Sequence, residues 1–386
     1  MGNEGIQPVY LDYCATTPIS PEVRTAMLPA LEDEFGNPSS LHSFGRAAKA
    51  AVENARSQVA QRIGANAQEI VFTSGATEAD NYVLLGIGAV YEQEKGHLIT
   101  SSIEHHAVLH TAQWLEKNGW QVTYLPVNTD GVIDPQDAAS AIQDNTRLIS
   151  LMMVNNETGT IQPIKEVGAI ARRHGILFLT DAVQALGLLP VSVNHLGVDF
   201  LSLSAHKIYG PKGSGALYIR EGTIIPPMFS GGPQEGTRRA GTENVPGIIG
   251  LGAAAAVTGV KVGNEFKRLS GLKSCLLNGL LGQVPDVQVN GPVEQTSPHV
   301  VSLTFPGSDG EMMLFLLNKY GLAVSMGSAC NASDTLPSHV LLAMGLTPAL
   351  ADATIRVSFG YPTQPADIDR LLDVLPEIVE QCRKIQ

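Results

Sequence analysis

The sequence predicts an α/β fold, in which a large domain built on a mostly parallel sheet is followed by a smaller α+β domain. From about residue 69 to residue 220, short apolar runs alternate with helical stretches. Strands that are apolar along their whole length and separated by helices indicate a parallel sheet covered on both faces. After Pro246 this alternation ends, and a chain of 386 residues is long enough for a second domain.

The elements follow in order. The expected strands of the large domain are residues 69–73, 97–101, 121–125, 147–154, 176–181, 199–204 and 215–220, with helices expected over 77–94, 106–119 and 164–175. The smaller domain is expected to hold helices over 251–281, 311–321 and 367–385 and strands over 299–305 and 354–360. Pro376 is expected to bend the last helix. We place residues 16–260 in the large domain, and residues 1–15 and 261–386 in the small one.

Composition excludes several classes of function. The formal charge is −12 and no block is rich in Lys or Arg, which argues against nucleic acid or an anionic membrane as the main ligand. We expect no membrane span, because no window approaches the roughly 20 apolar residues it requires, and the first residues do not resemble a secretory signal. The four cysteines are scattered, so neither a disulfide framework nor a metal site is expected, and the cytoplasm is the expected compartment.

Three strand ends carry residues that could do chemistry. Residues 74–78, Ser-Gly-Ala-Thr-Glu, lead from an expected strand into a helix, where free backbone N–H groups suit a phosphate. Asp181 ends a second strand, and Lys207 follows a third. In open α/β sheets, ligands bind beyond the carboxyl ends of the strands.

Each feature alone also has an ordinary interpretation: a strand-to-helix turn, a structural Asp, or a surface Lys. Lys212, among glycines, suits the last of these better than Lys207 does. Together the three have a common explanation. A phosphate cradle, a carboxylate for a pyridinium nitrogen and a lysine for a Schiff base are what pyridoxal 5'-phosphate (PLP) requires.

The segment SLSAHKIYGPKGSGALY resembles the PLP-lysine motif of class V aminotransferases, and most closely that of NifS/IscS-type cysteine desulfurases. The resemblance continues through YLDYCATTP, FGNPSSLHSFG, FTSGATEADN, IEHHAV, VNNETGTIQPI, TDAVQALG, RRAGTENV, VSMGSAC and IRVSFG. It implies PLP fold type I, a homodimer, and active sites near the subunit interface.

The resemblance also implies roles for individual residues. Lys207 would carry PLP, Asp181 would pair with the pyridinium nitrogen, Gln184 would face the phenolic oxygen, and His105 would lie against the ring and take part in proton transfer. The residues implied for the phosphate are Ala76, Thr77, Ser204 and His206, joined by Thr242 of the neighbouring subunit. Asn156 and Arg356 would hold the substrate carboxylate, for which the planar fork of Arg is suited.

Cys330 is the expected sulfur acceptor. It lies in GSACNASDTLPS, a run of small and polar residues at about 326–337 that predicts a loop, whereas Cys275 and Cys382 follow helical apolar patterns that predict burial. The loop resembles that of the desulfurase branch with a long catalytic loop, and the RxGHHC signature of the other branch is absent. Two positions depart from the family pattern: Cys14 replaces the usual Ala, and Asn331 the commoner Thr.

The function implied is a sulfurtransferase that converts L-cysteine to L-alanine, leaves a persulfide on Cys330, and supplies sulfur to an acceptor such as an iron–sulfur scaffold protein. Three alternatives stay open at this point: a cysteine or cystine lyase of the same fold, a class V aminotransferase, and a docking platform for sulfur delivery. A lyase would release pyruvate and would not need Cys330.

Overall fold

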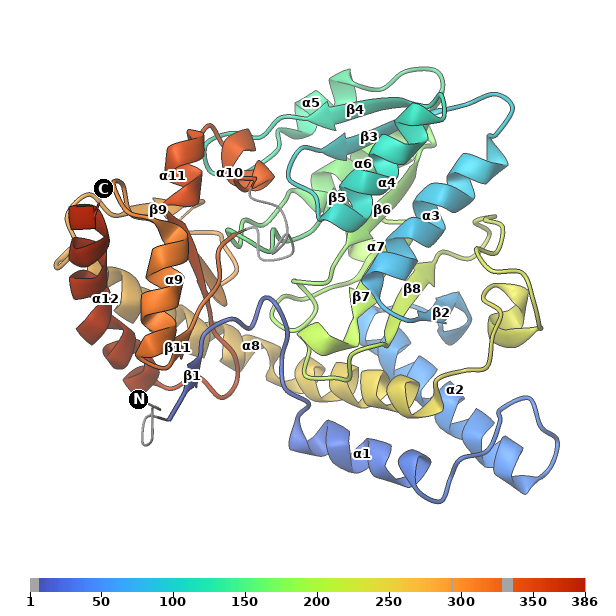
Figure 1. Cartoon of the computed structure of the whole chain (residues 1–386). Coiled ribbons are helices and arrows are strands. Elements are labelled where there is room, and N and C mark those ends of the chain that lie inside the picture. The colour runs from blue at the N-terminus through green and yellow to red at the C-terminus, as the bar shows by residue number, and fades with distance from the viewer. Residues whose placement is uncertain (1–6, 293, 328–335, 386) are drawn as a thin grey trace.

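A computed structural model describes residues 7–292, 294–327 and 336–385, without the side chain of residue 385. Its centre is a seven-stranded sheet in the order β2-β8-β7-β6-β5-β3-β4 (Figure 1). The strands are β2 (Ile70–Thr73), β3 (His97–Ser101), β4 (Gln121–Leu125), β5 (Thr146–Met152), β6 (Leu177–Asp181), β7 (Phe200–Ser204) and β8 (Gly215–Ile219). Strand β8 runs antiparallel to β2 and β7, and the other pairs are parallel. The expected α/β fold is therefore confirmed.

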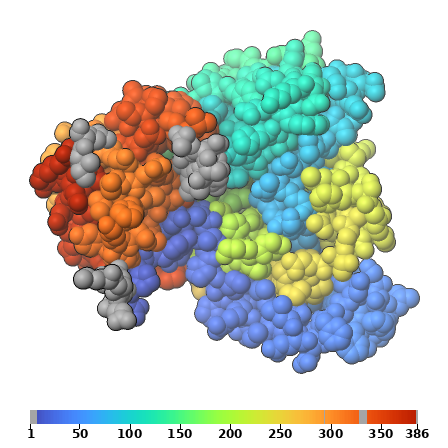
Figure 2. Space-filling model, viewed as in Figure 1, coloured from blue at the N-terminus to red at the C-terminus, as the bar shows by residue number. Residues whose placement is uncertain are grey.

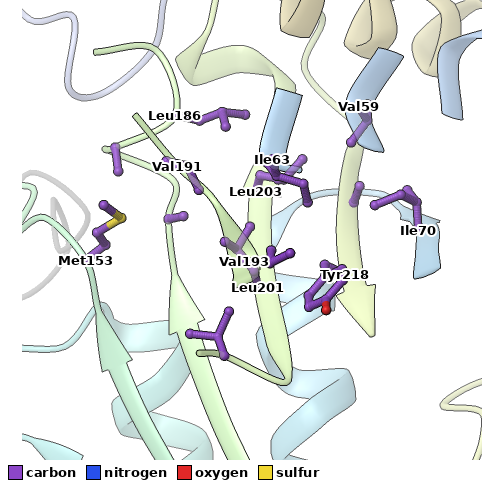
Figure 3. Close-up of a cluster of buried hydrophobic side chains, with 14 of the residues drawn as sticks. Val59, Ile63, Ile70, Met153, Leu186, Val191, Val193, Leu201, Leu203 and Tyr218 are labelled. Carbon is purple, nitrogen blue, oxygen red and sulfur yellow. The ribbon is translucent and has the colours of Figure 1, made fainter. Parts of the chain in front are cut away.

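Helices cover both faces of this sheet. On one face, α3 (Ala76–Val90) and α4 (His106–Lys117) lie side by side over a core that includes Leu98, Leu148 and Phe200 (Figure 1). On the other face, α2 (Ser43–Ile63), α6 (Ile164–His174) and α7 (Val193–Leu196) bury alternate residues such as Leu201. Figure 3 shows part of this second core, where Ile63, Leu203 and Tyr218 converge. Burial on both faces explains why these strands are apolar throughout.

A second, smaller core lies in the C-terminal part. Strands β9 (Gln288–Asn290), β10 (Val300–Thr304) and β12 (Thr354–Ser358) form an antiparallel sheet in the order β12-β10-β9. Strand β1 (Val9–Tyr10) pairs with β11 (Leu322–Ala323), which brings the N-terminal segment into this part of the molecule. Helices α9 (Gly310–Lys319) and α12 (Pro365–Ile385) cover the antiparallel sheet, and α12 continues through Pro376.

The remaining elements are short apart from α1. They are α1 (Pro21–Leu31), η1 (Ala67–Glu69), α5 (Pro135–Ser140), η2 (Ala205–Lys207), η3 (Gln234–Thr237), α10 (His339–Ala343) and α11 (Pro348–Asp352). The sequence patterns used above did not predict α1 or α2. Helix α2 has an Ala-rich buried side and a polar side, a pattern of helical period that was available to find it.

Helix α8 (Val245–Leu281) is 37 residues long and joins the two cores. Its first turns pack against α1 and α2, and its last turns pack against α12 (Figure 1). The expected domain boundary at residue 260 falls inside this helix. By length and composition α8 could cross a membrane, contrary to the expectation that no such window exists, but half of the apolar window is buried inside the protein. These contacts make α8 a core helix.

The cysteines of the two C-terminal helices differ. Cys382 is buried against the smaller core, as its helical pattern predicts. The prediction for Cys275 was wrong, because this residue is on the exposed side of α8, next to the buried Leu276 and Leu277. One position along a helix rotates a side chain by about 100°, which is enough to separate a buried face from an exposed one.

Candidate active site

A cavity of about 540 Å³ lies at the carboxyl ends of the central strands. Ten of the residues proposed from the sequence line it: Ala76, Thr77, His105, Asn156, Asp181, Gln184, Ser204, His206, Lys207 and Arg356. They come from the ends of β3, β5, β6 and β7, from the start of α3, and from β12 of the smaller sheet. A cavity at this edge is where an open α/β sheet is expected to bind its ligand.

Lys207 is the last residue of η2, the short helix that follows β7. Its ammonium group donates a hydrogen bond to the carbonyl of Cys14 and another, of 2.8 Å, to the carbonyl of Ala15. Both acceptors lie in the N-terminal segment, so this segment holds the lysine side chain at the cavity. Lys212 also lines the cavity, but it is exposed.

Asp181 ends β6 and lies next to Ser202 in the register of β7. Its side chain is 7% exposed, and Oδ1 accepts a 2.8 Å hydrogen bond from the backbone N–H of Val183. Burial raises the pKa of Asp181 to about 6, while the Val183 N–H and the charge of Lys207 act in the opposite direction. The carboxyl group is therefore mostly ionised at neutral pH.

The start of α3 is suited to binding an anion. No side chain caps the helix at Gly75, so its first backbone N–H groups are left for a ligand. The turn lies close to β8: a Cβ atom on Gly215 would come within 2.6 Å of the Gly75 Cα atom, so glycine is required there. Ser204 and His206 line the same cavity. Burial, with help from Lys207 and Lys212, lowers the pKa of His206 to about 4, so this imidazole is neutral at pH 7.

His105 caps the N-terminus of α4. Its Nδ1 accepts a 3.1 Å hydrogen bond from the N–H of Ala107. Burial, together with the charge of Lys207, lowers the pKa of His105 to about 4. A neutral imidazole that accepts at Nδ1 carries its proton on Nε2, so Nε2 is the nitrogen with a proton to donate.

Arg356 reaches the cavity from β12. It is 3% exposed; one terminal nitrogen donates to the carbonyl of Asn156 at 3.0 Å, and the other donates to Asp12 at 2.9 Å. The Nε atom has no hydrogen-bond partner among the described residues. Burial lowers the pKa of the Arg356 guanidinium, but Cys14 and Asp12 raise it by more than burial lowers it. The pKa of Arg356 is therefore raised above its usual value.

Gln184 belongs to a polar chain behind the cavity. Its amide nitrogen donates to the Cys14 carbonyl at 3.1 Å, and its oxygen lies 3.0 Å from Nε2 of His299. The other ring nitrogen of His299 lies 2.7 Å from the Ser297 hydroxyl. This chain fixes the amide orientation of Gln184.

One proposed residue, Thr242, is not among the residues that line the cavity. Thr242 is exposed and lines a separate depression beside Arg239 and Glu243. Cys330 lies outside the described residues. Sequence patterns missed Asp12, Asp80, Glu104 and His299, all in or behind the site. Asp12 lies within the YLDYCATTP motif and Asp80 within FTSGATEADN, so both motifs contained a signal.

Comparison with known proteins agrees with this geometry. Residues 9–371 match the family model of the class V aminotransferases. The chain belongs to that family. A cysteine desulfurase IscS from Methanosarcina thermophila is 49% identical over 377 residues, which is 98% of this chain and 93% of the relative. A cysteine desulfurase IscS from Dictyoglomus turgidum is 48% identical, over 98% and 96% of the two chains. A solved structure of a NifS-like protein superposes with a TM-score of 0.92 at 37% identity, covering 97% of this chain and all of that one. Within the family, the chain is of the cysteine desulfurase type.

PLP is the cofactor of these enzymes, and the cavity fits it. The uncapped start of α3 suits a phosphate, buried Asp181 suits a protonated ring nitrogen, and the Lys207 side chain is placed for a Schiff base. Arg356 lines the same cavity.

Proposed function

We propose that this cysteine desulfurase converts L-cysteine to L-alanine and carries the released sulfur as a persulfide on Cys330. The observation that supports this most is the presence of Lys207, Asp181 and Arg356 in one cavity. The first two residues suit PLP, and the third suits the carboxylate of an amino acid.

The cofactor-binding roles follow from the position of each residue. Ala76 and Thr77 would bind the phosphate through the first backbone N–H groups of α3, and Ser204 and neutral His206 would bind it through their side chains. Asp181 would face the ring nitrogen, and Gln184, with its amide orientation fixed by His299, would face the phenolic oxygen. When bound, PLP withdraws electrons from the substrate Cα and so weakens the bonds that this carbon makes.

Arg356 and Asn156 would bind the substrate carboxylate. The unpartnered Nε of Arg356 and its terminal nitrogens leave donors for this purpose, while Asp12 holds the guanidinium in place. His105 would lie against the cofactor and move a proton through Nε2. Lys207 would hold the cofactor, and its amine would take the proton from the substrate Cα.

Sulfur transfer would be carried out by Cys330. Its thiolate would attack the substrate sulfur, forming an S–S bond while the bond from sulfur to the substrate Cβ breaks. The electron pair of the broken bond stays with the carbon, which takes up a proton to become the methyl group of alanine. Cysteine and one protein thiol thus give alanine and one protein persulfide, with no external oxidant or reductant.

A homodimer is part of the proposal. Exposed Thr242 would reach the phosphate bound by the other subunit. Large apolar side chains are exposed along α1, α2 and the turn between them, the lower blue rim of the molecule in Figure 2: Leu31, Phe35, Leu41 and Phe44. The rings of Phe35 and Phe44 lie 5.7 Å apart. A patch of this kind is typical of a protein interface.

We place the enzyme in the cytoplasm, since the three described cysteines are all free. Its acceptor would be a second protein that takes the persulfide sulfur, and an iron–sulfur scaffold is the proposed example. Nucleic acid and membrane are not proposed as partners, because the formal charge is −12.

The proposal is tested by replacing Cys330 with Ser in the holoenzyme. A serine hydroxyl is hardly ionised near pH 7, so alanine production from cysteine should fall by about three orders of magnitude or more while the visible absorption of bound PLP is unchanged. Cys275→Ser, which alters an exposed cysteine on α8, is the matched control and should keep full activity. Unchanged turnover in Cys330→Ser with pyruvate as product would instead identify a lyase.

A further inference from the structure

A second buried carboxylate lies in the cavity and has no role in the proposed chemistry. Asp80, in α3, is 1% exposed and lines the cavity together with Asp181. Neither of its side-chain oxygens makes a hydrogen bond of standard geometry with another described residue. The buried hydroxyl of Ser202 on β7, which has no other partner there, is close enough to act on this carboxyl group and favours its ionised form. An ionised carboxylate in such a place would be strongly disfavoured, because a single neutral hydroxyl does not offset the hydration that burial removes.

The charges around Asp80 make ionisation still less favourable. The titratable groups that face it are Asp181 at the end of β6 and Glu104 after β3, both of which are carboxyl groups. The nearby cation, Lys207, acts on Asp181. Two carboxylates close together in a desolvated site cannot both ionise near neutral pH, and the one with donors and a cation beside it ionises first.

The same environments separate the pKa values of the three carboxyl groups. Burial, and then the charge of Asp181, raise the pKa of Asp80 well above its usual range, although the Ser202 hydroxyl acts in the opposite direction. Burial also raises the pKa of Glu104 to about 8. The pKa of Asp181 rises only to about 6, because the Val183 N–H and Lys207 favour its ionised form.

We propose that Asp80 is a positioning residue, a carboxylic acid that keeps its proton at neutral pH and so confines the negative charge of the pair to Asp181. This rests on the proposed function, in which Asp181 faces the ring nitrogen of the cofactor. A single negative charge at this place matches the single positive charge of a protonated ring nitrogen. A second negative charge, on Asp80, would raise the pKa of Asp181. Less of Asp181 would then be ionised at neutral pH and able to pair with the ring nitrogen.

The protonation state can be measured directly on the cofactor-free full-length chain. Infrared difference spectra between the native chain and Asp80→Asn at pH 7 should show the loss of one protonated-carboxyl band. Glu104→Gln, the matched control at the other buried carboxyl, should remove a different protonated-carboxyl band, because its pKa is about 8. Loss of an ionised-carboxylate signal in Asp80→Asn would overturn the proposal.

A second measurement follows PLP affinity as the pH is lowered. Because a neutral amide replaces a neutral acid, the midpoint at which Asp80→Asn loses affinity should stay within about 0.3 pH unit of the native value. An ionised Asp80 would give another result: removing its charge would lower the pKa of Asp181 and move the midpoint down by about one unit.

Should Asp80→Asn fail to fold, carbon-13 labelling of aspartate carboxyls in the native chain replaces it. One aspartate signal should remain protonated at pH 7, and the absence of such a signal would contradict the proposal. Failure of the proposed function looks different. If Asp181→Asn bound PLP as tightly as the native chain, Asp181 would not be the partner of the ring nitrogen. The protonation state of Asp80 is measured on the cofactor-free chain and does not depend on that result.

Discussion

The two ends of the cavity are built in different ways. At the proposed cofactor end, Asp181 is the last residue of β6 and Lys207 follows the neighbouring strand β7, and the register of those strands brings the two residues to the same edge of the sheet. At the substrate end, Arg356 comes from β12 of the smaller sheet and is held by Asp12 and the Asn156 carbonyl, which lie in two other segments. The cofactor end therefore depends mainly on one sheet, with the N-terminal segment holding the side chain of Lys207, and the substrate end depends on how two sheets meet.

The electrostatics of the two ends differ in the same way. Burial is the largest influence on Asp181, whose ionisation is restored in part by a backbone N–H and by Lys207. Arg356 is more deeply buried, yet its charge is supported by Asp12, an ion partner at 2.9 Å. We therefore expect changes at the cofactor end to remove function altogether, and changes at the substrate end to weaken binding.

The largest expected effect is at the cofactor end. Lys207→Ala should lose the visible absorption of the Schiff base and all measurable turnover, because the proposed covalent attachment point is removed. Absorption spectroscopy and an alanine assay measure both. Lys212→Ala is the matched control, since it also lines the cavity but is exposed. If Lys212→Ala abolished the absorption and Lys207→Ala did not, the assignment of the two lysines would be reversed.

An intermediate effect is expected at the substrate end. Arg356→Lys keeps the positive charge but loses the planar fork, so the KM for cysteine should rise about tenfold to a hundredfold with PLP still bound. Steady-state kinetics and the cofactor spectrum separate these two outcomes. Arg268→Lys, at an arginine of α8 that bonds to Glu265 and to the Thr363 carbonyl, should leave KM unchanged. A normal KM in Arg356→Lys would remove that residue from substrate binding.

The smallest effect is a pH dependence of cofactor affinity. The pKa of Asp181 is raised to about 6, so its ionised form dominates above this pH and is lost below it. PLP affinity should accordingly fall several-fold as the pH drops from about 7 to about 5, because the proposed anionic partner of the ring nitrogen becomes neutral. Fluorescence titration of the cofactor-free chain measures this. Asp181→Asn should show a flatter profile, and an equally steep one would assign the dependence to another group.

The comparison also explains what could be predicted from the sequence. Strands that are apolar on both faces predicted the large sheet. The charged residues at the ends of two of these strands, Asp181 and Lys207, were singled out by physical reasoning alone. Arg356 lies in the middle of a buried strand, between the apolar residues Ile355 and Val357. This pattern does not indicate which distant segments the Arg356 side chain contacts. Its expected role came only from the resemblance to a family. Asp80 was missed because an acidic residue in the first turns of a helix is ordinary. Only its three-dimensional surroundings show that it is buried beside two other carboxyl groups.

Helix α8 packs against both hydrophobic cores and so connects them. Its 37 residues form a continuous rod of roughly 55 Å, clamped by α1 and α2 at one end and by α12 at the other. Loss of packing at either end leaves the apolar side of the rod exposed along part of its length, so each core stabilises the other. The two ends of the cavity, although built from separate sheets, are thereby linked in their stability, and a heated chain is expected to lose both together.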